Sequence, residues 1–287
     1  MRYLFLLIKI SLLSVVLSVV VGGCYLFFLR ASIPSAWRYQ SSDAKQADKL
    51  ARSIQGKLHR ERWLNTGAIR WSILNNDYLW DLERGLVRAR FEDYQVLFHV
   101  EMKRYAVKQK PREGMNAGRW VKILGSEARE IATKAYELWL RDRFILEPSQ
   151  SLFDPHVERY AVDIDSKHPS LLVHYPKGGP QPRSTYHWEL KDHMPTGIRV
   201  WSKDLPFSGF LMEMDGWRIL DTGLKVSLMR SVGPFHLEIK AKAATSLSTF
   251  VGDRDPFQEI KGDPFEPMPT SQPNTMDKAA RTAELLR

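Results

Sequence analysis

The stretch AIRWSILNNDYLWDLERGLVRARFEDYQVLFHV, residues 68–100, decides the fold class of this chain. Its apolar side chains recur with a period of two, and polar or glycine-bearing breaks interrupt them at 75–77, 83–85 and 92–93. This pattern is typical of half-buried strands joined by hairpin turns. In residues 87–91, valine, alanine and phenylalanine alternate with two arginines, so one face meets the core and the other meets water or phosphate. The stretch therefore predicts a meander of antiparallel strands.

The same pattern returns between residues 157 and 241, with turns at 177–179, 215–216 and 221–223. Two stretches have a helical period instead, one from Ser42 to about residue 60 and one from Ser126 to about Arg143. We expect both helices to lie on the sheet, although the first could also lie among lipid headgroups. The fold class predicted is α+β, mostly antiparallel β: a curved meander sheet or half-barrel covered by two helices.

Residues 10–29 carry no charged side chain. As a helix they would be about 30 Å long, which matches the hydrocarbon core of a bilayer. Residues 1–30 are therefore predicted to be a signal anchor, a single transmembrane helix with an extracytoplasmic body. The single cysteine, Cys24, follows Val-Gly-Gly, so a cleaved and lipidated start is the alternative. The apolar residues YLFFLR after Cys24 favour the uncleaved anchor.

The body is predicted to span residues 31–251 and to be followed by a flexible tail, 252–287. Prolines at 256, 264, 267, 269 and 273 and few apolar residues mark this tail. Lysine and arginine outnumber the acids by 42 to 33. The first explanation of this excess is an ordinary solvated surface that happens to be basic, and the alternative is a body held near an anionic membrane surface. No basic run or nucleic-acid motif is present, so nucleic acid is not an expected partner.

The sequence predicts neither a metal nor a cofactor, because the 8 histidines form no ligand cluster and no phosphate loop or dinucleotide fingerprint is present. No nucleophile elbow occurs either, so the protein is not expected to be an enzyme. A hydrolase whose residues converge only in space is the lesser alternative.

The strands carry an unusual load of aromatic and methionine side chains, which could form an apolar trough for acyl chains. The alternative is ordinary core packed against the two helices. The residues predicted to line the trough are Trp71, Trp80, Phe91, Phe98, Tyr186, Trp188, Trp201, Phe210 and Met212.

The segment STYHWELKDHMPTGIRVWS, 184–202, together with the order of elements, resembles the LolA and LolB type of bacterial lipoprotein carrier. The segment AYELWLRDRFILEPSQSLFDP, 135–155, and the strands after it resemble a group of uncharacterised bacterial proteins built on the same plan. The resemblance covers residues 42 to about 243 and implies a half-barrel with a helical lid in the cell envelope. Carriers of this type are free in the periplasm, so an uncleaved span implies a tethered acceptor or local lipid-handling protein at the bacterial inner membrane.

Two functions follow. The first is an anchored envelope protein that binds a lipid or acylated ligand non-enzymatically, with lipid or lipoprotein as its partner. The second is a structural or interaction subunit of an envelope complex that has a protein partner and no small ligand.

Overall fold

The computed structural model describes residue 33 and residues 44–101, 104–110, 118–163, 169–176, 183–202 and 208–260. Within these ranges the strands form one 13-stranded open sheet with the order β6-β5-β4-β3-β2-β1-β13-β12-β11-β10-β9-β8-β7. Every neighbouring pair is antiparallel. The predicted α+β class with an antiparallel meander is confirmed.

The strands fall into two blocks along the chain. The first block consists of β1 (Ala68–Ile73), β2 (Asn76–Asp81), β3 (Leu86–Phe91), β4 (Tyr94–His99), β5 (Tyr105–Gln109) and β6 (Val121–Ile123). The second block consists of β7 (Glu158–Asp163), β8 (Pro169–Tyr175), β9 (Ser184–Lys191), β10 (Met194–Trp201), β11 (Phe210–Ile219), β12 (Lys225–Val232) and β13 (Phe235–Ala244).

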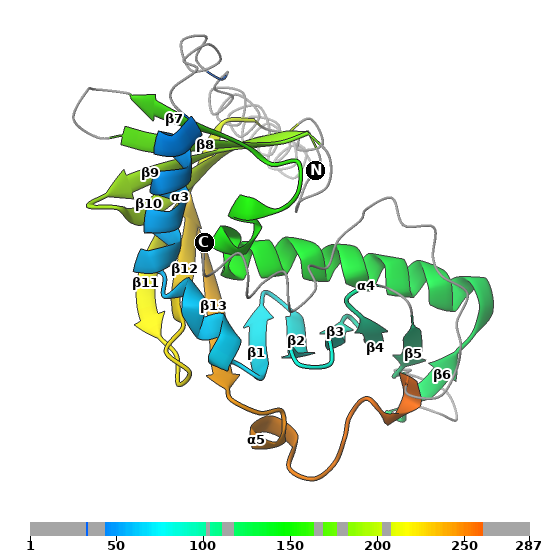
Figure 1. The fold of residues 1–287 in the computed structure, drawn as a ribbon. Coiled ribbons are helices and arrows are strands. Elements are labelled where there is room, and N and C mark those ends of the chain that lie inside the picture. The colour runs from blue at the N-terminus through cyan, green and yellow to red at the C-terminus, as the bar shows by residue number, and fades with distance from the viewer. Residues whose placement is uncertain are drawn as a thin grey trace, which may run out of the picture.

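Strand β13 joins the two blocks because its two halves pair with different partners. Residues 235–238 pair with β12, whereas residues 239–244 pair with β1. The sheet bends where this exchange occurs, so that β1–β6 and β7–β12 lie at an angle to each other (Figure 1). The bend creates the inner corner in which the helices lie.

Strand alternation gives the sheet two distinct faces. Val87, Ala89 and Phe91 are buried on the face that carries the helices, which we call the helix face. Arg88 and Arg90 point to the opposite, outer face, as the alternation predicts. The register continues the helix face across β13 and β12 into the second block, so one apolar surface runs along the sheet.

Two helices cover the helix face. Helix α3 (Ala44–Lys57) packs on β7, β8 and β10, and helix α4 (Gly125–Leu146) packs on β3, β4, β5 and β12 (Figure 1). Helix α4 ends where Glu147 leaves the helical region before Pro148, because a residue that precedes proline disfavours helical dihedrals. Both predicted helices are present, and short 3-10 helices follow each of them at Arg60–Asn65 and Pro148–Phe153.

The first residues of the predicted tail, 252–260, pack on the sheet. Up to Ile260 the chain packs on the outer face of β4 and β5, where Phe257 and Ile260 are buried with Leu97 and Ala106. Leu97 and Ala106 point to the outer face, where Phe257 and Ile260 cover them. The proline-rich composition of the segment concealed these two covering residues from the sequence prediction. We call residues 245–260 the strap; the rest of the predicted tail lies outside the described residues.

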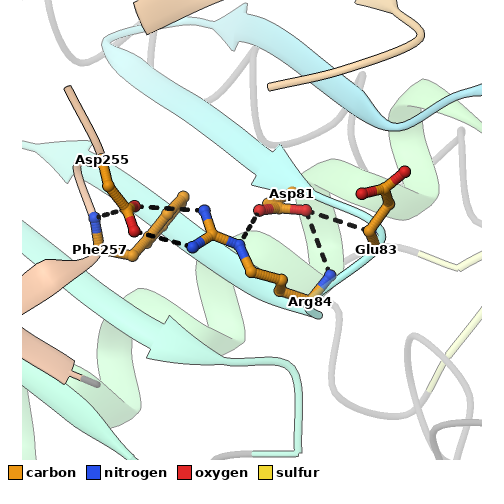
Figure 2. A network of polar contacts seen from close by, with 5 residues as sticks. All are labelled: Asp81, Glu83, Arg84, Asp255 and Phe257. Atoms are coloured by element: carbon orange, nitrogen blue, oxygen red, sulfur yellow. Dashed lines mark hydrogen bonds and ion pairs between the residues drawn. The ribbon is translucent and has the colours of Figure 1, made fainter. Parts of the chain in front are cut away.

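A polar network fixes the strap to the β2–β3 turn. The guanidinium of Arg84 donates two hydrogen bonds to the carboxylate of Asp255, at 2.9 and 3.2 Å, and also donates to Asp81 (Figure 2). Asp255 in turn accepts the backbone N–H of Phe257, at 3.0 Å (Figure 2). This network places the Phe257 ring in its pocket.

The predicted anchor, residues 1–30, lies outside the described residues, as does Cys24. In the part of the chain that the structure describes, no helix is both long enough and apolar enough to cross a bilayer.

Candidate ligand-binding face

Aromatic rings gather on the helix face where α4 crosses the first block of strands. The Trp80 and Trp139 ring centroids are 5.4 Å apart with an edge-to-face arrangement, and Phe98 lies 5.7 Å from Trp139. Trp63, from the 3-10 helix after α3, adds its ring 6.0 Å from Trp80. Trp71 stacks on Tyr78 at 4.8 Å. The cluster therefore combines rings from both helical segments and from the sheet.

The structure places the predicted trough residues in more than one cluster. Trp71, Trp80, Phe91 and Phe98 belong to the cluster under α4. A second cluster under α3 contains Tyr186, Trp188 and Met212, with the half-buried Phe210 packed against it. Trp201 lies on the outer face instead, because it is one residue out of phase with Val200. The sheet therefore does not form a single trough lined by all of these side chains.

The helices close over these side chains. Trp71 is 1% exposed and Trp188 is 0% exposed. Packing of this kind holds the apolar surface away from water, and a ligand can reach the rings only when a helix moves away from the sheet. The helices thus act as covers in the arrangement observed.

Several buried indole N–H groups on this face lack a hydrogen-bond acceptor among the described residues. They belong to Trp63, Trp71, Trp80, Trp139 and Trp188. Buried indoles ordinarily find an acceptor, and an unmade hydrogen bond costs about 1–3 kcal/mol. The face therefore offers donors in apolar surroundings, and the carbonyl of an ester or amide is a group that could accept from them.

Cationic side chains border the aromatic cluster. The Arg143 guanidinium carbon lies 4.9 Å from the Trp139 ring centroid and 5.9 Å from that of Trp80. The corresponding carbon of Arg60 lies 5.9 Å from the Trp63 ring. Guanidinium groups over indole faces are attracted by the ring quadrupole. The cluster thus has an apolar interior and a positively charged border.

Buried polar groups that the sequence did not reveal hold α4 to the sheet. The carboxylate of Asp142, 1% exposed, accepts hydrogen bonds from Tyr78 Oη, Asn76 Nδ2 and Arg141 Nε, each at 2.8 Å. Burial is the main cause that raises the pKa of Tyr78, and the Asp142 charge adds to it. The Tyr78 hydroxyl therefore remains a donor, and Asp142 fixes α4 to β2.

A second polar group binds the C-terminal end of α4, one turn beyond Asp142. Arg230 of β12 is 2% exposed, and its guanidinium donates to the backbone oxygens of Ile145, at 2.6 Å, and Leu146, at 3.4 Å. These carbonyls belong to the last turn, where a helix has no internal donors and favours a cation. Burial lowers the pKa of Arg230 to about 10, against the opposing effect of Glu147. Arg230 thus caps α4 at the corner of the sheet.

Glu147 lies beside this cap and is also buried. Its carboxylate accepts the backbone N–H of Ser149 at 2.9 Å and the Ser149 hydroxyl. Burial raises the pKa of Glu147, while Ser149, Arg60 and Arg230 act in the opposite direction. No isolated sequence motif marks these residues, because they converge through the pairing of β12 with β13.

Among the residues that the structure describes, no group of three or more His, Cys, Asp or Glu side chains could hold a metal ion. His187 Nε2 lies 2.8 Å from Ser170 Oγ, which is the geometry of a base and a nucleophile. However, His187 is 1% exposed, and burial together with Arg199 lowers its pKa to about 4. A buried imidazole with this pKa is a poor general base for a substrate from solvent.

The depressed pKa of His187 predicts a pH dependence of stability. In the unfolded chain the His187 imidazole binds a proton below about pH 6.5, whereas in the folded chain it stays neutral down to about pH 4. The stability of the fold therefore falls as the pH falls between these values. We expect a loss of at most about 3 kcal/mol. Urea unfolding of the body, residues 31–287, at a series of pH values measures it. His187→Gln should flatten this slope, whereas His156→Gln, at an exposed site, should leave it unchanged; equal slopes in all three proteins would refute the assignment.

Comparisons with known proteins find solved structures of low similarity. No family model matches the chain, and no curated protein matches it. A DUF1329 family protein from Desulfovibrio piger is 10% identical, with a TM-score of 0.34 over 76% of this chain and 97% of that chain. A domain from Vibrio parahaemolyticus named for outer membrane lipoprotein sorting is 7% identical, with a TM-score of 0.28 over 70% of this chain and 92% of that chain.

The chain is thus structurally similar, at a low TM-score, to a domain named for lipoprotein sorting, as the sequence resemblance implies. At TM-scores this low, the likeness assigns neither a site nor a ligand.

Proposed function

We propose that this protein binds a lipid or acylated ligand on the helix face, without enzymatic chemistry, while anchored in a bacterial inner membrane through residues 10–29. The observation that carries the proposal is the set of buried indole donors that have no acceptor among the described residues. Apolar walls bind an acyl chain through dispersion and the release of water. The indole N–H groups of the same walls would donate to the carbonyl of its ester or amide.

The cationic border supports a ligand with an anionic end. Arg143 and Arg60 lie against the aromatic cluster, so a phosphate or carboxylate attached to the acyl group would meet guanidinium groups at its margin. Lipids and acylated proteins are amphiphiles of this kind. The arrangement favours binding and presentation, because no described group is placed for catalysis.

The polar contacts indicate which helix moves to admit a ligand. Helix α4 is held by buried bonds at both Asp142 and Arg230. Helix α3 has a partly exposed ion pair from Asp48 to Arg159, at 2.7 Å, and one bond from Gln55 to the Ser149 carbonyl, at 3.1 Å. Contacts near the surface are easier to break than buried ones. We therefore propose that α3 opens together with the 3-10 helix after it, whose Trp63 lies against Trp80, and that α4 stays in place.

Trp80→Phe tests the role of the indole donors. Phenylalanine keeps an aromatic ring but removes the N–H group, and the loss of one ligand hydrogen bond of about 1 kcal/mol weakens binding about fivefold. The measurement is a titration of the body, residues 31–287, with a fluorescent acyl ester. Trp120→Phe, outside the helix face, is the matched control and should bind as the parent does. Equal affinities for all three proteins would remove the Trp80 donor from the site.

An interaction subunit without a small ligand is the second candidate, and exposed apolar side chains favour it. Leu74, Leu124 and Phe235 are 74%, 68% and 72% exposed. Isolated exposed apolar residues are common on soluble proteins, so this observation is weaker than the unpartnered donors. Absence of saturable binding in the same titration would favour this candidate.

A further inference from the structure

The outer face of the first block of strands carries a concentration of cations. The strand register places them in two rows that run across the strands. One row contains Lys240, Arg90, Lys108 and Lys122, and the other contains Lys242, Arg70 and Arg88. We call these two rows the basic face; it is opposite the helix face and separate from the proposed ligand site.

Few carboxylates balance these charges. Asp77 of β2 lies within the first row and accepts the Arg70 guanidinium at 3.1 Å, and Glu259 of the strap pairs with Lys108. Glu238 borders the rows at the next outward-facing position of β13. The basic face therefore keeps a surplus of positive charge after its own ion pairs are counted.

The partly buried side chain of Arg88 also reflects the surplus of positive charge on this face. Its side chain is 12% exposed, its Nη2 lies 3.9 Å from Asp77 Oδ1, and its Nε has no partner among the described residues. Burial lowers the pKa of Arg88 to about 10, and the charges of Arg90 and Arg70 act in the same direction. Asp77 already bonds Arg70 more closely, so the three arginines share one nearby carboxylate.

The register also places like charges directly opposite one another. Arg70 faces Lys242 across β1 and β13, and Lys108 faces Lys122 across β5 and β6. Such cross-strand pairs are destabilising. Fold stability does not explain this arrangement, whereas an anionic partner would convert the repulsion into binding.

We propose that the basic face docks on the headgroups of an anionic phospholipid bilayer. The first row extends across seven neighbouring strands, a width of about 29 Å at the usual strand spacing, which suits a broad charged surface. Trp120 and Leu74, 40% and 74% exposed, lie at the same end of these strands, before β6 and after β1. A tryptophan at this position suits a membrane interface. Each Lys or Arg near such a surface strengthens binding about fivefold.

The test uses the full chain reconstituted in vesicles of phosphatidylcholine alone or with about 30% phosphatidylglycerol. A dye on Ser72→Cys, in a Cys24→Ser background, reports the centre of the basic face, and a quencher on the lipid headgroups reports contact. We expect quenching several-fold greater with phosphatidylglycerol, and its loss at about 0.5 M salt. A dye on Glu213→Cys, on the outer face of the second block, should show no such difference.

Charge reversal at Lys240→Glu and Lys242→Glu provides the second arm. Glutamate at 242 faces Arg70, so the variant replaces a repulsion with an ion pair and should stay folded. We expect its quenching to fall to the level seen in phosphatidylcholine. The matched double variant Lys191→Glu and Arg218→Glu removes the same charge from the second block and should behave as the parent.

Equal quenching in both vesicles, or no effect of the reversal at 240 and 242, would overturn the proposal. Nucleic acid would replace the bilayer as the partner if quenching did not depend on phosphatidylglycerol and duplex DNA protected the dye from the quencher. The titration of residues 31–287 with a fluorescent acyl ester reports the helix face separately, so failure of one proposal is distinguishable from failure of the other.

Discussion

Arg230→Met is expected to destabilise the body, residues 31–287, by about 3–5 kcal/mol, because removing one partner of a buried charge interaction leaves the rest unpaired. The guanidinium supplies the donors for the Ile145 and Leu146 carbonyls and also donates to the Ser227 and Met229 carbonyls, at 3.1 and 3.2 Å. Methionine fills a similar volume but donates to none of them. Glu147 would also lose its neighbouring cation.

The measurement for Arg230 is equilibrium urea unfolding followed by tryptophan fluorescence. Arg230→Lys keeps the charge without the planar fork and should lose an intermediate amount of stability. Arg218→Met, at an exposed position of β11, is the control and should change stability by less than about 0.5 kcal/mol. Unfolding midpoints of Arg230→Met and Arg218→Met that coincide would show that α4 does not depend on this cap.

Asp142→Ala is expected to cost about 3 kcal/mol, for the corresponding reason one turn before the end of α4. Its carboxylate accepts the Tyr78 hydroxyl and the Asn76 amide, and both donors would be left in buried or half-buried surroundings. Tyr78→Phe alone removes one bond and should cost about 1 kcal/mol.

A double-mutant cycle separates the free-energy contribution of the Tyr78–Asp142 hydrogen bond from that of the other contacts of Asp142. The double variant of Asp142→Ala and Tyr78→Phe should be more stable than the sum of the single losses predicts, because phenylalanine leaves no unpaired hydroxyl. Glu130→Ala, on the exposed side of α4, is the control. Strict additivity of the two changes would show that the Tyr78–Asp142 bond contributes nothing of its own.

These two anchors connect stability to the proposed function. Buried hydrogen bonds hold α4 to β2 and to β12. Helix α4 is therefore attached to the sheet more firmly than α3 is. A ligand that enters under α3 meets Trp188 and Tyr186 first. The cluster under α4, with Trp80 and Trp139, then forms the firmer wall of the site.

Local patterning predicted the elements of this fold well. The alternation in residues 87–91 assigned the correct face to each side chain, since a strand has one period whatever its neighbours are. The helical spacing of residues 42–60 and 126–143 predicted α3 and α4. Both signals depend on residues close in sequence, which is why they could be interpreted without a structure.

Long-range pairing determined what the sequence could not show. The exchange of partners along β13 brings Arg230 to the end of α4, and neither residue type nor spacing signals it. The same pairing separates the predicted trough residues into two clusters. The outward direction of Trp201 follows from strand alternation alone, because it is one residue out of phase with Val200. The strap was missed because Phe257 stands alone among prolines and charges, and its burial depends on Leu97 and Ala106.

Native mass spectrometry of the body, residues 31–287, purified from a bacterial host, tests the central claim most directly. The account predicts a saturable acyl species that co-purifies with the protein and is reduced in the Trp80→Phe variant but not in Trp120→Phe. A clean protein mass that acquires no acyl species when lipid is supplied would contradict the claim that the helix face is a binding site.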